Sequence, residues 1–281
     1  MLAAETYGSR VALIARVAVS LRGGQGDCTR YCAALDAALE SEPPPFDTEE
    51  YAKIYRESSL DPRWMATSLL TNAEMEGDGS RRLWSLAACT PDPDEKAQLK
   101  RHAVDESRHS LMYLALVDLA FPDAIAPDFR RELRQLSPGF SMRQELSPVA
   151  GSPYAKVATI DEYLQMNIAE IRTTIHHLMQ RRAIRVHCPP ENVPAIMRIQ
   201  DSLLNDELAH VAYTGLLIEK IAGRTERGEV DALFRKRVRD FNTITMDELG
   251  DFLFGCSTAC CARHSSCRAK APAAAPQTYD A

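Results

Sequence analysis

Two copies of one short motif carry the side chains whose chemistry is easiest to interpret in this 281-residue chain. The first copy reads Asp105-Glu106-Ser107-Arg108-His109, and the second reads Asp206-Glu207-Leu208-Ala209-His210. In each copy the Glu and the His are three residues apart, so on an α-helix they share one face about a turn apart. Chance is a poor explanation for two copies in a chain with only 7 His. Carboxylates and imidazoles are both metal ligands, so the motifs predict a metal site.

The surroundings of the first motif make a metal ion the natural partner of its charges. On a helix, Glu106 and His109 would share their face with Leu99, Ala103 and Val117, which are apolar or small. Burying an unpaired charge on such a face is strongly unfavourable. A bound metal ion would compensate the charge, and the second motif has a similar apolar setting.

A helix expected at about residues 62–89 offers two acids as a further ligand. Glu76 shares its face with Leu69, Ala73, Leu83 and Ala87, which suits a core, whereas Glu74 lies on the face of Asp78 and Arg81, which suits water. We therefore expect Glu76 to be the ligand. Gly77 and Gly79 follow it directly, and we expect them to leave space beside the site.

A helix from about residue 154 or 159 to residue 184 supplies the fourth carboxylate. We expect it to be Glu170, because Glu162, another acid of this helix, lies near its N-terminus and would cap it. Asn167, Thr173 and Thr174 give the face around Glu170 a polar character. His177, two turns past Glu170, is either a seventh ligand or a buried histidine without a metal contact.

These side chains require four long helices, which the sequence places at about residues 62–89, 93–121, 154 or 159–184, and 194–222. Asp92 can cap the second of them, with Pro93 in its first position and Glu95 completing a capping box. No strand pattern is present, so the fold class is all-α. We expect N-terminal wrapping helices in residues 1–61, the bundle in residues 62–255, and a Cys-rich, disordered tail in residues 256–281.

The helices together present an ordered array of metal ligands: Glu76, Glu106 with His109, Glu170, and Glu207 with His210. In a four-helix bundle this array builds a di-metal carboxylate site. Four carboxylates balance two divalent ions, and nitrogen with hard oxygen ligands suits iron or manganese. We expect Glu106 and Glu207 to bridge the two metals. Asp105 and Asp206 are placed to accept the free N–H of a ligand His across the bundle.

The array resembles that of the ferritin-like non-haem diiron superfamily over about residues 62–222. Its two Asp-Glu-x-x-His motifs resemble those of bacterial diiron oxygenases and oxidases, with the p-aminobenzoate N-oxygenase-like branch as the nearest. That N-oxygenase has an extra histidine ligand four residues before its last ligand Glu, where this chain has Leu203. The aldehyde-deformylating oxygenases share the array, and the stretch from Glu76 to Ala87 resembles their first ligand helix.

The resemblance implies a ferritin-like four-helix bundle that holds two iron ions or a manganese–iron pair. It also implies an enzyme of biosynthetic metabolism that activates O₂ to oxidise a small organic molecule, by N-oxygenation, hydroxylation or oxidative C–C cleavage. The alternative is a ferritin-like ferroxidase or metal-handling protein without an organic substrate. An enzyme needs a substrate site beside the metals, and the two glycines and the polar face around Glu170 favour one.

Composition narrows the partners of the chain. A net charge of −6 and a pI near 5.7 argue against nucleic acid, which requires a basic face. The chain contains no run of 18 apolar residues, so we expect no membrane span. Half of the 8 Cys lie near the C-terminus, unlike a secreted disulfide framework, so we expect a cytoplasmic protein. The expected partners are a small-molecule substrate and O₂, with an electron-donor protein and a second copy of the chain as further candidates.

Overall fold

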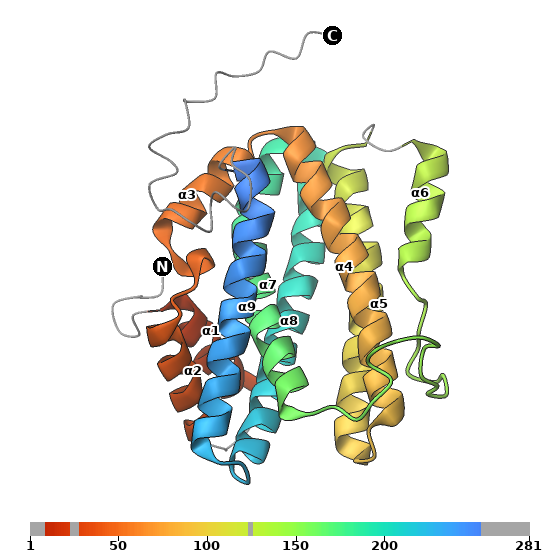
Figure 1. Ribbon diagram of the computed structural model, residues 1–281. Coiled ribbons are helices and arrows are strands. Elements are labelled where there is room, and N and C mark those ends of the chain that lie inside the picture. Colours follow the sequence, from red (N-terminus) through yellow and green to blue (C-terminus); the bar gives the residue numbers. More distant parts are fainter. Residues whose placement is uncertain (1–8, 23–27, 123–125, 254–281) are drawn as a thin grey trace.

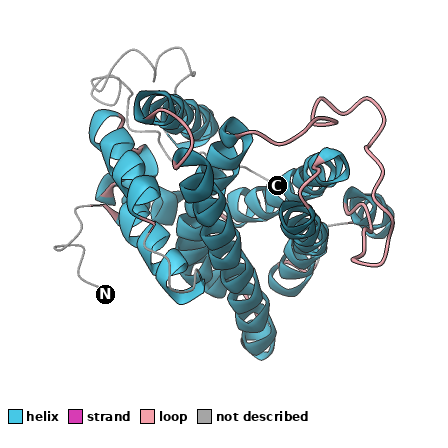
Figure 2. Ribbon diagram, turned by 90° about the horizontal axis from the view of Figure 1, so that it is seen from below, coloured by secondary structure: helices cyan, strands magenta, loops and turns pink. Residues whose placement is uncertain are grey.

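The computed structural model describes residues 9–22, 28–122 and 126–253, and every regular element in these ranges is helical (Figure 2). The all-α class is therefore confirmed. The α-helices are α1 (Arg10–Arg22), α2 (Thr29–Ser41), α3 (Glu49–Ser58), α4 (Pro62–Cys89), α5 (Pro93–Ala120), α6 (Pro127–Leu133), α7 (Ile160–His187), α8 (Val193–Ala222) and α9 (Arg227–Leu253). Short 3-10 helices are η2 (Pro45–Asp47), η3 (Arg134–Leu136) and η4 (Pro190–Asn192).

Four long helices form the centre of the molecule as two antiparallel pairs. Helix α4 pairs with α5 and α7 pairs with α8, and α5 contacts α8 to join the two pairs (Figure 1). Helices α1 and α2 pack against α8 and α9 packs against α2 and α7. Buried residues of all these helices form one continuous apolar core. The four helices that carry the predicted ligands are thus the four central ones.

The central helices begin where their sequences provide caps. The Asp61 side chain accepts hydrogen bonds from the backbone N–H groups that open α4, and Asp92 does the same for α5. Each is followed by proline, which fits the first helical position. Thr159 and Glu162 form a capping box at the start of α7. The predicted roles of Asp92 and Glu162 are therefore confirmed.

Glu95 has a different role from the capping box that the sequence predicts. Its carboxylate accepts hydrogen bonds from the Tyr163 hydroxyl at 3.2 Å and from Lys220 Nζ at 3.1 Å. Asp92 alone satisfies the backbone N–H groups at this end of α5. Glu95 instead connects α5 to α7 and α8.

The long connection between α5 and α7 lies against α4 and α5. A Cβ atom on Gly77 would come within 2.3 Å of the backbone oxygen of Leu136, so the segment can approach α4 only because residue 77 is glycine. Ser107 Oγ lies 2.7 Å from Ser137 Oγ. Gly77 therefore makes room for this segment, whereas the sequence predicts space beside the metal site. At Gly79 a Cβ atom would meet only Glu106 Oε2, at an ordinary 3.7 Å.

The sequence also makes predictions about the C-terminal tail and about membrane spans. The Cys-rich tail predicted for residues 256–281 lies outside the described residues. None of the helices in the described part combines the length and apolar character that crossing a membrane would need.

Candidate metal centre

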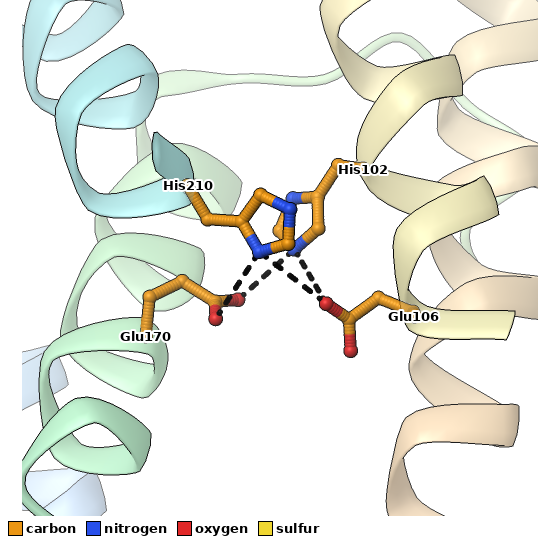
Figure 3. A group of neighbouring side chains, drawn as sticks. All are labelled: His102, Glu106, Glu170 and His210. Atoms are coloured by element: carbon orange, nitrogen blue, oxygen red, sulfur yellow. Dashed lines mark ion pairs between the residues drawn. The ribbon is translucent and has the colours of Figure 1, made fainter. Parts of the chain in front are cut away.

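The central helices bring the six predicted ligands together with one more histidine, in two buried groups. The His102 group consists of His102, Glu106, Glu170 and His210, and the His109 group consists of Glu76, Glu106, His109 and Glu207. In each group one possible ligand atom per residue lies within 4.8 Å of the others. Figure 3 shows the His102 group, in which α5, α7 and α8 all contribute. Glu106 belongs to both groups, so the groups adjoin.

The two motif histidines point their Nδ1 atoms at the glutamate carboxylates. His109 Nδ1 lies 3.4 Å from Glu207 Oε1 and 3.6 Å from Glu106 Oε1. His210 Nδ1 lies 3.5 Å from Glu207 Oε2 and 3.4 Å from Glu106 Oε1. Each oxygen of Glu207 therefore faces a different histidine, which is the orientation that a carboxylate bridging two metals needs.

The outer nitrogens of both histidines contact the motif aspartates crosswise, as the sequence predicts. His109 Nε2 lies 3.2 Å from Asp206 Oδ2, and His210 Nε2 lies 3.4 Å from Asp105 Oδ2. Arg108 donates to both aspartates, at 3.0 Å to Asp105 and 2.6 Å to Asp206. A histidine that donates its Nε2–H to a carboxylate keeps the Nδ1 lone pair free for a metal.

His102 is the site residue that sequence reasoning missed. It is 1% exposed, and its Nε2 atom lies 3.1 Å from both Glu106 Oε1 and Glu170 Oε1. Its Nδ1 atom is 2.7 Å from the Tyr213 hydroxyl. The available signal was its position four residues before Glu106, which places both on one helix face.

His177, the candidate for a seventh ligand, belongs to neither group. Its Nε2 atom lies 3.6 Å from Glu207 Oε1 and 3.3 Å from the Tyr113 hydroxyl. It therefore lies beside the centre, next to Glu207.

The two neighbouring acids of α4 differ in burial and in position. Glu76 is 9% exposed and lies within the His109 group, whereas Glu74 is exposed.

Asn167 donates to the Val211 carbonyl and to Thr214 Oγ1, and it accepts from the Tyr31 hydroxyl at 2.8 Å. The Asn167 side chain therefore holds helices α2, α7 and α8 together. The sequence predicts that it contributes to a polar surface for a substrate, and the structure shows that it does not.

The four carboxylates repel one another, and their pKa values separate accordingly. Burial and the charge of Glu76 raise the pKa of Glu106 well above its usual range, and burial and the charge of Glu170 raise the pKa of Glu207. Burial opposes ionisation of Glu170 as well, but His102 beside it brings its pKa below the usual range. Without a metal, burial and mutual repulsion therefore disfavour the ionised forms of Glu106 and Glu207.

The pKa values of the histidines in the centre also separate. Burial alone would lower the pKa of His109, but its contacts with Asp206 and Glu76 raise it to about 9. Burial, followed by the positive charge of His210, lowers the pKa of His102 to about 4. His102 is therefore a neutral imidazole at neutral pH, which is the form that binds metals.

The unsatisfied polar atoms of the centre fit bound metal ions. The buried atoms that lack a hydrogen-bond partner include Glu106 Oε1, both oxygens of Glu207, His102 Nε2, His109 Nδ1 and His210 Nδ1. Leaving such an atom unsatisfied costs about 1–3 kcal/mol, and more for a charged group. All six atoms belong to residues of the two groups, and four carboxylates can balance two divalent ions. The two groups could therefore hold metal ions with nitrogen and oxygen ligands.

The position of these seven side chains is the basis for assigning a candidate metal centre to the protein. Four of them come from the α4–α5 pair and three from the α7–α8 pair. In comparisons with known proteins, no family model, no curated protein and no solved structure matches this chain.

Proposed function

We propose that the protein is an O₂-dependent oxidoreductase whose ferritin-like bundle holds two iron ions and oxidises a small organic molecule. The observation that carries the proposal is a set of six buried nitrogen and oxygen atoms that make no hydrogen bond and that face one another in the two groups. A purely structural cluster would satisfy these atoms with hydrogen bonds. Metal ligation explains why they remain open in a close-packed core.

The residues of the centre divide into ligands and supports. His109, His210 and the neutral His102 would each provide one nitrogen, and Glu106 and Glu207, whose oxygens face these histidines, would provide carboxylate ligands. Glu76 and Glu170 would provide the two remaining carboxylates. Two ferrous ions, when bound there, would supply electrons for the reduction of O₂.

His177 can serve proton movement beside the centre. Its Nε2 atom lies between the Tyr113 hydroxyl and Glu207 Oε1, at 3.3 Å and 3.6 Å. A proton on this nitrogen can be directed to either oxygen. His177 would thus connect a buried tyrosine hydroxyl to a carboxylate of the centre.

The third imidazole gives the centre an asymmetry that supports an oxygenase. The His102 group has two histidines and the His109 group has one. The p-aminobenzoate N-oxygenase, which the motifs resemble, has its extra histidine four residues before its last ligand Glu. His102 stands in the same relation to Glu106, in the first motif of this chain.

The test is anaerobic Fe(II) loading followed by rapid mixing with O₂, with and without candidate amines, acids and aldehydes. We expect one substrate class to accelerate O₂ consumption and to yield an oxidised product. Glu106→Ala should abolish this reaction, and Glu74→Ala, at an exposed position, should retain it. Iron oxidation without an organic product in every case would favour a ferroxidase instead.

A further inference from the structure

A second set of buried polar atoms without partners extends from the metal centre towards the far end of α7. In the described part of the chain it comprises Ser110 Oγ, Thr174 Oγ1, His177 Nδ1, Gln180 Oε1, and both amide atoms of Gln200. All five residues are at most 2% exposed. Unsatisfied buried polar atoms are costly to a fold and require an explanation. Gln180 contacts Tyr55 of α3 through a side-chain hydrogen bond, but Ser110 Oγ, Thr174 Oγ1, His177 Nδ1 and the Gln200 amide reach no hydrogen-bond partner among the described residues.

The register of α5 and α7 places two of these hydroxyls directly beside the centre. Glu106 and Glu170 both lie 3.1 Å from His102 Nε2, and Tyr113 contacts His177. Ser110 lies four residues past Glu106 on α5, and Thr174 lies four residues past Glu170 on α7, so each hydroxyl shares a helix face with one of these carboxylates, one turn away. The two hydroxyls therefore occupy one level, between the metal-binding carboxylates and the Tyr113–His177 contact, about 6 Å along the helices from the carboxylates.

The chemistry of this level is polar and lacks a positive side chain. Hydroxyl groups can both donate and accept hydrogen bonds, and the second nitrogen of an imidazole can do one or the other according to its tautomer. No Lys or Arg is among the buried residues of the described ranges. In the loaded centre four glutamates already balance two divalent ions, so a carboxylate bound here would lose its hydration without gaining a net positive charge, which is unfavourable. An uncharged molecule with hydrogen-bonding groups avoids this penalty.

We propose that Ser110, Thr174 and His177 bind a small, uncharged, hydrogen-bonding molecule such as an amide or an alcohol, in preference to a carboxylic acid. The inference rests on the proposed function, because it names the substrate class of the same centre. Helix α5 rises about 10 Å from Glu106 to Tyr113, which limits a molecule in this span to roughly the size of one substituted ring. Gln180 and Gln200 continue the uncharged polar character beyond His177.

The first experiment measures binding of two probes of the same shape, benzamide and benzoate, to the anaerobic Fe(II)-loaded protein by ligand-observed NMR. We expect benzamide to bind at least about tenfold more tightly than benzoate. Thr174→Val, which replaces the hydroxyl by a methyl group, should weaken benzamide binding about tenfold, the effect of one hydrogen bond. The matched control Thr173→Val, one residue away and half-buried, should change it less than about twofold. Equal or tighter binding of benzoate, no binding of either probe, or equal effects of the two variants would overturn the proposal.

The second experiment separates a binding hydroxyl from a structural one. In the absence of a probe, Thr174→Val should raise the Tm by roughly 2–4 °C, because it removes an unsatisfied buried hydroxyl. A lower Tm would mean that the hydroxyl stabilises the fold through its own contacts, and would overturn the proposal. Metal analysis of the same samples keeps the two proposals distinguishable. Protein that holds iron but prefers benzoate contradicts only the substrate class, and protein without iron that prefers benzamide contradicts only the metal centre.

Discussion

At the scale of single residues, the most informative side chain is His102. It is buried, it contacts Glu106 and Glu170, and its Nδ1 atom is occupied by the Tyr213 hydroxyl. That contact leaves Nε2 free and directed at the carboxylates. Because burial and His210 keep its pKa low, His102 needs no deprotonation before it binds a metal.

The first prediction concerns the stoichiometry that His102 supports. His102→Ala should lower the iron content after anaerobic reconstitution from about two to about one per chain, because the His102 group loses a nitrogen ligand. His187→Ala is the matched control, since His187 Nε2 contacts the Ser59 backbone oxygen instead. Metal analysis of the folded variants checks the prediction. Full loading of the His102 variant would show that this histidine is not a ligand.

The second prediction separates the two neighbouring acids of α4. Glu76→Ala should abolish loading of the His109 group, whereas Glu74→Ala should leave it nearly intact, because only Glu76 is buried among the ligands. The same metal analysis applies to both variants. Loss of iron in the Glu74 variant alone would reverse the assignment.

At the scale of elements, the connection between α5 and α7 depends on close approach to α4. Gly77→Ala places a methyl group 2.3 Å from the Leu136 oxygen, which is backbone and cannot rotate away. We expect a loss of about 1–3 kcal/mol in the free energy of unfolding, the usual range for overpacking. Gly79→Ala is the control, since its methyl group meets only an ordinary contact. It should be neutral or stabilise α4 by up to about 1 kcal/mol. Urea titrations of both variants check this, and equal stabilities would contradict it.

The helices could be predicted from sequence because their signals are local. Asp92 with Pro93, and Thr159 with Glu162, mark helix starts by side chains next to the backbone they cap. The role of Gly77 could not be predicted, because its neighbour Leu136 is distant in sequence. The role of Asn167 could not be predicted for the same reason, since its partners lie on α2 and α8.

The candidate site was predictable as far as it follows a repeated motif. Glu106, His109, Glu207 and His210 repeat one spacing, and apolar neighbours single out Glu76. His102 lies outside the motif and has no counterpart in the second half, where Leu203 stands four residues before Glu207. A search for any histidine on the ligand face of each helix would have found it.

At the scale of the whole molecule, the centre lies between two helix pairs. Its ligands come from α4 and α5 on one side and from α7 and α8 on the other. Bound metal would therefore hold the pairs together and stabilise the fold by linkage.

Metal binding should also release protons. The pKa of His109 is raised to about 9 in the metal-free centre and that of His210 is raised well above its usual range, so near neutral pH His109 carries a proton that a metal must displace. Metal affinity should accordingly rise with pH between about 6 and 8, by up to about tenfold per unit for each proton released. Calorimetric titration with Fe(II) under anaerobic conditions, in buffers of different ionisation enthalpy, counts these protons. Binding without proton release would contradict the electrostatic description.

The measurement that tests the central claim most directly is a crystal structure of the Fe(II)-reconstituted protein with anomalous scattering at the iron edge. The account predicts two anomalous peaks per chain, one within the His102 group and one within the His109 group, with Glu106 contacting both. A single peak, peaks at other residues, or none in fully reconstituted protein would contradict a dinuclear centre.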